Sequence, residues 1–242
     1  MNSSARAVGV LAAFLLTAGA LVAHAFDDAA MKEQLARLNP GRAEGNLNLP
    51  PPAVVEVLQA SIGCNQSVDF DAGLPSDWAV VSNEPSGPQW GTLASCGESG
   101  NYTNGAADVA CVSSDIFGSA EMDSELRTPA FSTVGQASVT LDFTANYQNF
   151  ANLDFHDVDV SVDGGTGWTN VLRWNEDHGA FRAQPGENVN LDISAVAANQ
   201  ASVIIRWRYY DPNTGDYNWY AQVDDVAVTC VVPVDLQSFE VE

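Results

Sequence analysis

The strongest constraint on the fold of this chain is a two-residue repeat of apolar and polar side chains in its second half. Residues 139–147 alternate strictly, with apolar side chains at one parity and Thr, Asp or Asn at the other. The same period recurs over 158–162 and 203–210. Because successive side chains of a β-strand point to opposite faces of a sheet, this period indicates half-buried antiparallel strands.

Turn-forming residues separate these predicted strands, at 163–165, 184–186 and 211–215. Gly, Pro, Asn and Asp favour such positions because they accept or impose turn geometry. No segment of helical period lies between the strands, which argues against alternating strands and helices. We therefore expect an all-β fold, a two-sheet antiparallel jelly-roll sandwich over residues 61–230.

The start of the chain has the pattern of a signal peptide, residues 1–25. Arg6 precedes an apolar run over 8–22, and Ala23 and Ala25 form a small-x-small cleavage site. An uncleaved membrane anchor is the alternative, although the run is short and no later stretch approaches the length of a membrane span. We expect a secreted, extracellular protein, with the periplasm or the cell surface as alternatives.

Residues 26–60 are expected to be a largely irregular linker. A short helix is compatible with 29–38, but Pro40 and the prolines at 50–52 end anything longer. Residues 231–242 form a C-terminal tail without an apolar span or a basic end.

The charge of the chain excludes several partners. It has 9 Lys+Arg against 31 Asp+Glu, a formal net charge of −22. Nucleic acids and anionic membranes attract basic surfaces, so neither is expected as a partner, whereas cations are.

Four cysteines are present, and an exported chain with an even number favours two disulfides over metal ligation. Three pairings are open. We favour Cys96–Cys111, which closes a short loop, and Cys64–Cys230, which ties the first strand to the last.

Four motifs together resemble a known family. An aromatic–acid–Gly–Trp motif lies at 68–78 and a Val-Asp-Asp-Val motif lies at 223–226, with further matching segments at 122–129 and 157–168. They resemble the choice-of-anchor J or cleaved-adhesin domains of secreted bacterial proteins, relatives of the MAM domain. The resemblance covers about residues 64–230. It implies a non-catalytic jelly-roll module, of a kind that accompanies peptidases or surface proteins.

The resemblance also implies a structural calcium ion. Carried over by position, its ligands would be Asp71 and Asp224, with Asp71 standing where the family more often has Glu. Asp115 and Asp123 are further candidates.

A separate argument from the residues concerns Asp224, which shares the predicted strand face of Val226 and Val228. An inward carboxylate needs a partner, and bases are scarce in this chain, so a hard cation bound by oxygens fits. An ion pair with Arg206, or exposure to water, remains the alternative.

Two turn motifs receive a structural interpretation. Residues 161–168 match the Ser-x-Asp-x-Gly-x-x-Trp pattern of an Asp box, in which Asp163 binds turn amides and the glycines adopt positive φ. Residues 211–216 resemble the start of an EF-hand loop, but the glycine position holds Asp216.

Aromatic residues gather late in the chain, and sugar-binding jelly rolls often stack sugars on exposed rings. Trp207 and Tyr209 share a strand face with apolar residues and are expected in the core. Tyr210, Tyr217 and Tyr220 are candidates for an exposed ligand-binding platform, with core packing or edge cover as the alternative.

Catalytic motifs are absent from the sequence. It has neither a His-Glu-x-x-His nor a Gly-x-Ser-x-Gly motif, and His156 and His178 are expected at the surface. Asp157 and Asp159 share a strand face, as the paired carboxylates of a laminarinase-like glycoside hydrolase would. That family uses glutamates, and none occurs between Glu125 and Glu176.

The sequence therefore predicts a secreted, calcium-stabilised module that binds an extracellular glycan or protein and catalyses no reaction. The alternatives are an accessory interaction domain of a secreted peptidase or surface system, and the hydrolase. The oligomeric state stays open.

Overall fold

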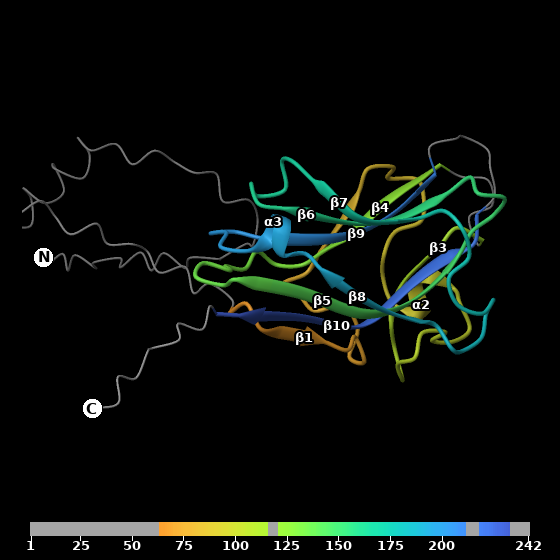
Figure 1. Cartoon of the computed structure of the whole chain (residues 1–242). Helices are drawn as coiled ribbons and strands as arrows, with labels where there is room; N and C mark the ends of the chain where they lie inside the picture. The colour runs from red at the N-terminus through yellow and green to blue at the C-terminus, as the bar shows by residue number, and fades with distance from the viewer. Residues whose placement is uncertain (1–62, 116–120, 212–217, 233–242) are drawn as a thin grey trace, which may run out of the picture. The chain divides into compact units, whose positions relative to one another are not determined.

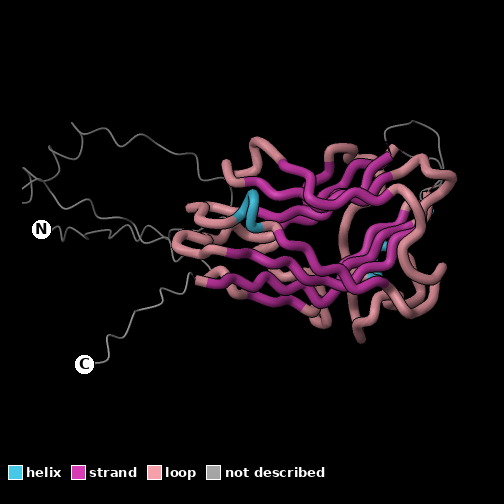
Figure 2. Tube along the Cα trace, in the orientation of Figure 1, coloured by secondary structure: helices cyan, strands magenta, loops and turns pink. Residues whose placement is uncertain are grey.

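A computed structural model describes residues 63–115, 121–211 and 218–232 of the chain. The expected signal peptide and linker, residues 233–242 of the expected tail, and Tyr217 lie outside these residues. Val231, expected to begin the tail, is the last residue of a strand. The described part forms two antiparallel sheets that lie one above the other, as the expected β-sandwich requires (Figures 1 and 2).

The first sheet has the strand order β1-β10-β5-β8, and β3 also pairs with β10. Its strands are β1 (Gln66–Val68), β3 (Ala110–Ser113), β5 (Ser138–Gln148), β8 (Glu187–Asp192) and β10 (Tyr220–Val231).

The second sheet has the order β2-β4-β9-β6-β7. Its strands are β2 (Ala79–Ser82), β4 (Met122–Arg127), β6 (Phe155–Ser161), β7 (Thr169–Trp174) and β9 (Ile204–Asp211). Two single-turn helices, α2 (Leu93–Cys96) and α3 (Ser194–Ala197), lie in connections. None of the helices described is long and apolar enough to cross a membrane.

The core lies between the sheets, and the residues that share the alternating parity fill it. Trp207 is fully buried; it stacks on Trp78 at 5.8 Å and meets the edge of Phe143 at 5.6 Å. Tyr209 is also fully buried. The expectation that Trp207 and Tyr209 belong to the core is confirmed.

His156 is buried as well, so its expected place at the surface is wrong. It lies in β6 at a core-facing parity, opposite Tyr209 on β9 and Trp174 on β7. Burial lowers the pKa of His156 to about 3, so the ring is neutral.

Both favoured disulfides are present. Cys64–Cys230 joins the segment before β1 to β10, and Cys96–Cys111 joins α2 to β3. The first and last strands of the domain are neighbours, with Val68 opposite Val226.

A bulge in β10 changes which residues face the core. Ala221 and Val223 pack in the core before it, and Val226 after it, because one extra residue enters β10 between Asp224 and Ala227. Asp225 takes a positive φ of 49° there. The expectation that Asp224 shares a face with Val226 is therefore wrong.

Strands β3, β5, β7 and β9 end, and strands β4, β6, β8 and β10 begin, at the same end of the sandwich, which we call the loop end (Figure 1). This loop end gathers side chains that are far apart in the sequence.

Candidate functional site

Three aromatic side chains meet at the loop end, and we call them the aromatic platform: Phe150, Phe181 and Trp219. The rings of Phe150 and Phe181 lie 6.2 and 5.1 Å from that of Trp219, both at 73° to it. Phe150 is 40% exposed and Phe181 is 51% exposed. Exposed apolar side chains that lie together, unlike single scattered ones, are a feature of interaction sites.

A small hollow lies beside the platform. It has a volume of about 270 Å³ and is lined by Asp115, Phe150, Asn218 and Trp219. Asn218 is almost fully buried; its Nδ2 donates to Asp211 at 2.8 Å, while its Oδ1 accepts no hydrogen bond from the residues described. The hollow thus combines an aromatic wall with a carboxylate and an amide.

Arg182 places a positive charge against the platform. Its guanidinium carbon lies 5.3 Å from the ring centre of Phe181 and 5.6 Å from that of Trp219. Its Nε and Nη2 each donate to Glu98 at 3.1 Å, and Nη2 also donates to Asp115 at 2.5 Å. These hydrogen bonds, with Glu98 first, raise the pKa of Arg182.

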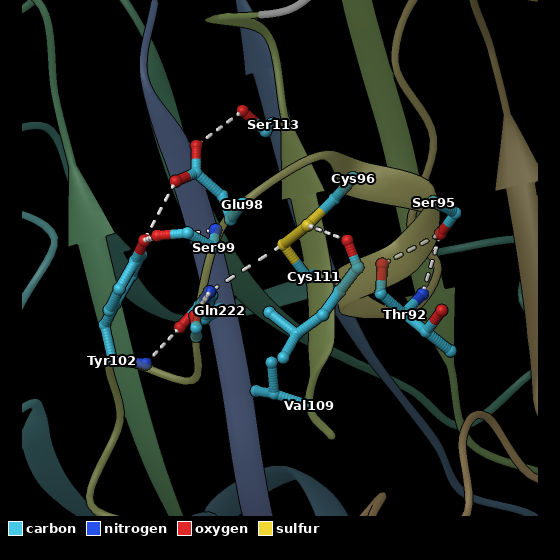
Figure 3. Close-up of a disulfide and its surroundings, with 12 residues drawn as sticks. Thr92, Ser95, Cys96, Glu98, Ser99, Tyr102, Val109, Cys111, Ser113 and Gln222 are labelled. Atoms are coloured by element: carbon cyan, nitrogen blue, oxygen red, sulfur yellow. Dashed lines mark hydrogen bonds between the residues drawn. A yellow bond between two sulfur atoms is a disulfide. The ribbon is translucent and has the colours of Figure 1, made fainter. Parts of the chain in front are cut away.

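Glu98 belongs to the disulfide loop, residues 97–109, which Cys96–Cys111 closes (Figure 3). Glu98 is buried, and its Oε1 accepts a hydrogen bond from Ser113 at 3.0 Å (Figure 3). A buried carboxylate needs charge compensation, and Arg182 supplies it.

Two buried amides fix the disulfide loop to the first sheet. Gln222 accepts from the Tyr102 amide at 2.7 Å (Figure 3) and donates to the Gly100 carbonyl at 2.9 Å. Asn146 donates to the Tyr102 carbonyl at 3.1 Å.

Asn146 also holds the β7–β8 loop, residues 175–186, which carries Phe181 and Arg182. Its amide donates to the carbonyls of Ala180 and Ala183 at 2.9 and 3.3 Å. One buried side chain therefore clamps both loops on the same sheet.

Tyr210 and Tyr220, two of the three tyrosines expected to form the platform, lie elsewhere. Tyr220 is fully buried, and its hydroxyl accepts a hydrogen bond from the Arg182 amide at 2.7 Å, so it positions Arg182 and presents no open face. Tyr210 is partly exposed on the outer face of the second sheet, where it stacks on Phe155 at 5.3 Å and Arg208 lies 4.2 Å from its ring centre.

The platform lies beside the segment where it was expected, but other residues form it. Trp219 directly precedes Tyr220, the first residue of β10. Because successive side chains along a strand point to opposite faces, one of two neighbouring aromatic residues is buried while the other stays partly exposed, and the sequence does not say which. Phe150 directly precedes the turn at 151–152 and Phe181 follows the polar segment 175–178, so an aromatic residue in a loop is the signal that identifies them.

The four acids proposed for calcium have different surroundings. Asp71 is exposed beyond the end of β1, whereas Asp224 is buried beneath the disulfide loop. Asp115 pairs with Arg182, and Asp123 pairs with Arg208 through two hydrogen bonds at 2.7 and 2.6 Å.

In the ranges that the structure covers, no three His, Cys, Asp or Glu side chains are grouped so as to hold a metal ion. These four acids thus do not form one site here. Calcium binding stays a prediction.

Asp224 has partners that explain its burial without a cation. Its Oδ2 accepts from Asn101 at 2.7 Å and its Oδ1 from the Asp225 amide at 2.9 Å. Burial raises its pKa to about 6. A Cβ at position 105 would lie 2.0 Å from Oδ2, so only Gly105 fits there. Neither of the alternatives, an Arg206 pair or exposure to water, is found.

The carboxylates of the hydrolase alternative do share a strand face, but each is paired. Asp157 accepts from Arg173 at 2.8 and 2.7 Å, and Asp159 accepts from Arg206 at 2.8 Å. Both are buried under these partners.

The Asp-box segment is a hairpin turn, as its pattern predicts. Asp163 accepts from the Gly167 and Thr166 amides at 2.8 and 3.1 Å, and Gly164 and Gly165 have φ of 76° and 88°.

Comparison with known proteins adds a fold but no family. No family model matches the sequence, and no curated protein matches it. Among solved structures, the described architecture is similar to that of other β-sandwiches.

One such structure is the K3 cleaved adhesin domain of Lys-gingipain from Porphyromonas gingivalis W83. It has a TM-score of 0.50 and 20% identity, and the match covers 68% of this chain and 96% of that domain. The K1 domain of the same protein gives 0.48 and 22%, covering 69% and 98%. A CBM22-2 xylan-binding domain from Paenibacillus barcinonensis gives 0.39 and 12%, covering 69% and 99%. At these identities the likeness shows the fold alone.

Proposed function

We propose that this protein is an extracellular binding module that recognises a glycan through the aromatic platform and the two polar side chains beside it, Asp115 and Asn218. The observation that carries the proposal is the convergence of Phe150, Phe181 and Trp219, two of them about half exposed, at the loop end. These rings come from three different connections, so the fold assembles them.

The chemistry of the platform suits sugars. A sugar ring has apolar C–H faces that pack on aromatic rings and hydroxyls at its edges that need hydrogen-bond partners. Asp115 and Asn218 border the hollow and provide such partners next to the rings.

The loops that carry the platform are held in advance of binding. Asn146 fixes the β7–β8 loop to the first sheet through buried hydrogen bonds, and Phe150 is fixed by its amide, which donates to Asp154 at 3.1 Å. Gln222 fixes the disulfide loop, whose Glu98 in turn holds Arg182. A preformed site loses less conformational entropy when the ligand binds.

Two further observations agree with a role outside the cell. The two disulfides are stable in an oxidising compartment. The K3 domain, whose fold is similar, is described as a cleaved adhesin domain.

Binding to a glycan array, followed by titration of each hit, tests the proposal. We expect Phe181→Ala to weaken binding at least tenfold, which corresponds to about 1.4 kcal/mol. Because Phe181 is exposed, this variant should fold normally. Binding should also persist at high salt, since it does not depend on opposite charges.

Phe155→Ala is the matched control, because it removes the same side chain from an aromatic pair on the outer face of the second sheet. It should bind within twofold of the wild type. Equal losses in both variants, or no glycan hit, would contradict the proposal; a protein partner captured from culture medium would then favour the accessory-domain alternative.

A further inference from the structure

We infer that the platform selects uncharged glycans and rejects acidic ones, and that Asp115 is the residue that determines this specificity. The inference rests on the proposed function and adds the chemical class of the ligand. It depends on the ion pairs around Arg182.

Acidic sugars bind proteins mainly through cationic side chains, with arginine matching the carboxylate in a bidentate pair. Within the ranges described, Arg182 is the one base that contacts the platform. The other arginines of these ranges, Arg127, Arg173, Arg206 and Arg208, lie in the second sheet, and each is paired with an acid.

The N–H groups of Arg182 that would bind a ligand carboxylate already donate hydrogen bonds to Glu98 and Asp115. Glu98 engages Nε and Nη2, which is the bidentate geometry that a sugar carboxylate would need. Asp115 binds Nη2 from the other side. The group of one arginine and two carboxylates thus has a net charge of −1 where the ligand would lie.

The two acids differ in how they face a ligand. The Glu98 side chain is 3% exposed, so a ligand cannot reach it. The Asp115 side chain is 40% exposed and lines the hollow. Asp115 is therefore the negative charge that an incoming glycan meets. A uronate or sulfate beside it is repelled, while a sugar hydroxyl can donate to it.

The overall charge of −22 acts in the same direction. An acidic polymer approaching this surface is repelled over a Debye length, about 8 Å at physiological salt, and this repulsion weakens as salt is added. An uncharged glycan feels neither effect.

The experiment uses one array that carries neutral, uronate-containing and sulfated glycans, probed with three proteins. Wild type should bind neutral glycans only. Asp115→Asn keeps the shape of the side chain and leaves Arg182 held by Glu98, but it removes the charge that faces the ligand. We expect this variant to gain at least tenfold in binding to uronate-containing glycans relative to the wild type.

Asp142→Asn is the control for net charge. Asp142 lies in the middle of β5 and pairs there with Ala227, away from the loop end, so the same change in charge should not alter the specificity. Melting curves of both variants should match the wild type, since neither side chain is in the core.

The outcomes separate the two proposals. Wild-type hits among acidic glycans as strong as those among neutral ones overturn the inference and leave the proposed function in place. An Asp115→Asn variant that gains no acidic hit also overturns it. The absence of hits in every class contradicts the proposed function itself, and the inference with it.

Discussion

Replacing Asn146 with alanine tests whether one buried amide holds the binding loops. Asn146 is fully buried; it donates to carbonyls of both loops and its Oδ1 accepts from Gln148 at 3.2 Å. The amide has two hydrogens, so the variant loses two donated bonds and one accepted bond. At about 1 kcal/mol for each net hydrogen bond, we expect the free energy of unfolding to fall by about 3 kcal/mol.

Asn146→Asp makes the test more specific. It preserves the shape and the acceptor but replaces the donors with a carboxylate that faces backbone carbonyls. An unpaired buried charge costs more than a lost hydrogen bond, so this variant should be less stable than Asn146→Ala at pH 7. Protonation at low pH should narrow the difference.

The assay is urea unfolding with linear extrapolation, and glycan binding measured where each variant is folded. Asn188→Ala is the control, because Asn188 also receives an amide bond, from Asn104 at 2.8 Å, but at an exposed site; its effect should stay within about 0.5 kcal/mol. A loss below about 1 kcal/mol in Asn146→Ala, or equal losses in both variants, would refute the reasoning.

Three further predictions follow from single side chains. Tyr220→Phe removes the acceptor of the Arg182 amide, so thermal unfolding should show a loss of about 1–2 kcal/mol and titration should show weaker glycan binding; an unchanged affinity would mean that Tyr220 does not position Arg182. His156 has a pKa of about 3 when folded and 6.5 as its ordinary value, so the unfolded chain binds a proton between these values that the folded chain does not. The stability conferred by the neutral ring is present above pH 6.5 and is lost as the pH falls towards 3. In urea unfolding, the free energy of unfolding of His156→Phe should therefore rise relative to that of the wild type by about 1.4 kcal/mol for each unit by which the pH falls in that window, and the same pH dependence in both proteins would contradict burial of His156. The raised pKa of Asp224, about 6, acts in both proteins and does not affect this difference. For calcium, EDTA should lower the Tm and added calcium restore it, and identical melting curves would discard the ion.

The alternation in the sequence predicted the strands well because period two has one structural meaning in an antiparallel sheet. Residues 139–147 form most of β5, with the apolar parity inside, and 203–210 contains most of β9. Both favoured disulfides also follow from the chain, since Cys64 precedes the first strand and Cys230 lies near the end of the last, and Cys96 and Cys111 close a short loop.

Reasoning from the two-residue alternation failed at the bulge formed by Asp224 and Asp225. A single inserted residue reverses the parity of everything beyond it, and strict alternation gives no warning. The only local signal is an Asp-Asp pair, since Asp tolerates the left-handed conformation that Asp225 adopts. Asp224 was therefore assigned to the wrong face.

The candidate site was predicted only in its position along the chain. The buried Tyr220 and the partly exposed Trp219 are adjacent in sequence, and burial of Tyr220 depends on the disulfide loop, which packs over it from more than a hundred residues away. No local pattern contains that contact. Likewise, the occupation of Arg182 by Glu98 and Asp115 depends on three separate connections.

The Cys64–Cys230 bond has a mechanical consequence. It joins the chain where the described domain begins to the chain where it ends, and its two cysteines have a sequence separation of 166. Tension applied along the polypeptide from both sides therefore passes through the covalent sulfur bridge instead of shearing β1 from β10. When the module is pulled through its two ends, the loops between the two cysteines therefore bear none of the force. After a reducing agent breaks the Cys64–Cys230 bond, the whole sandwich bears it.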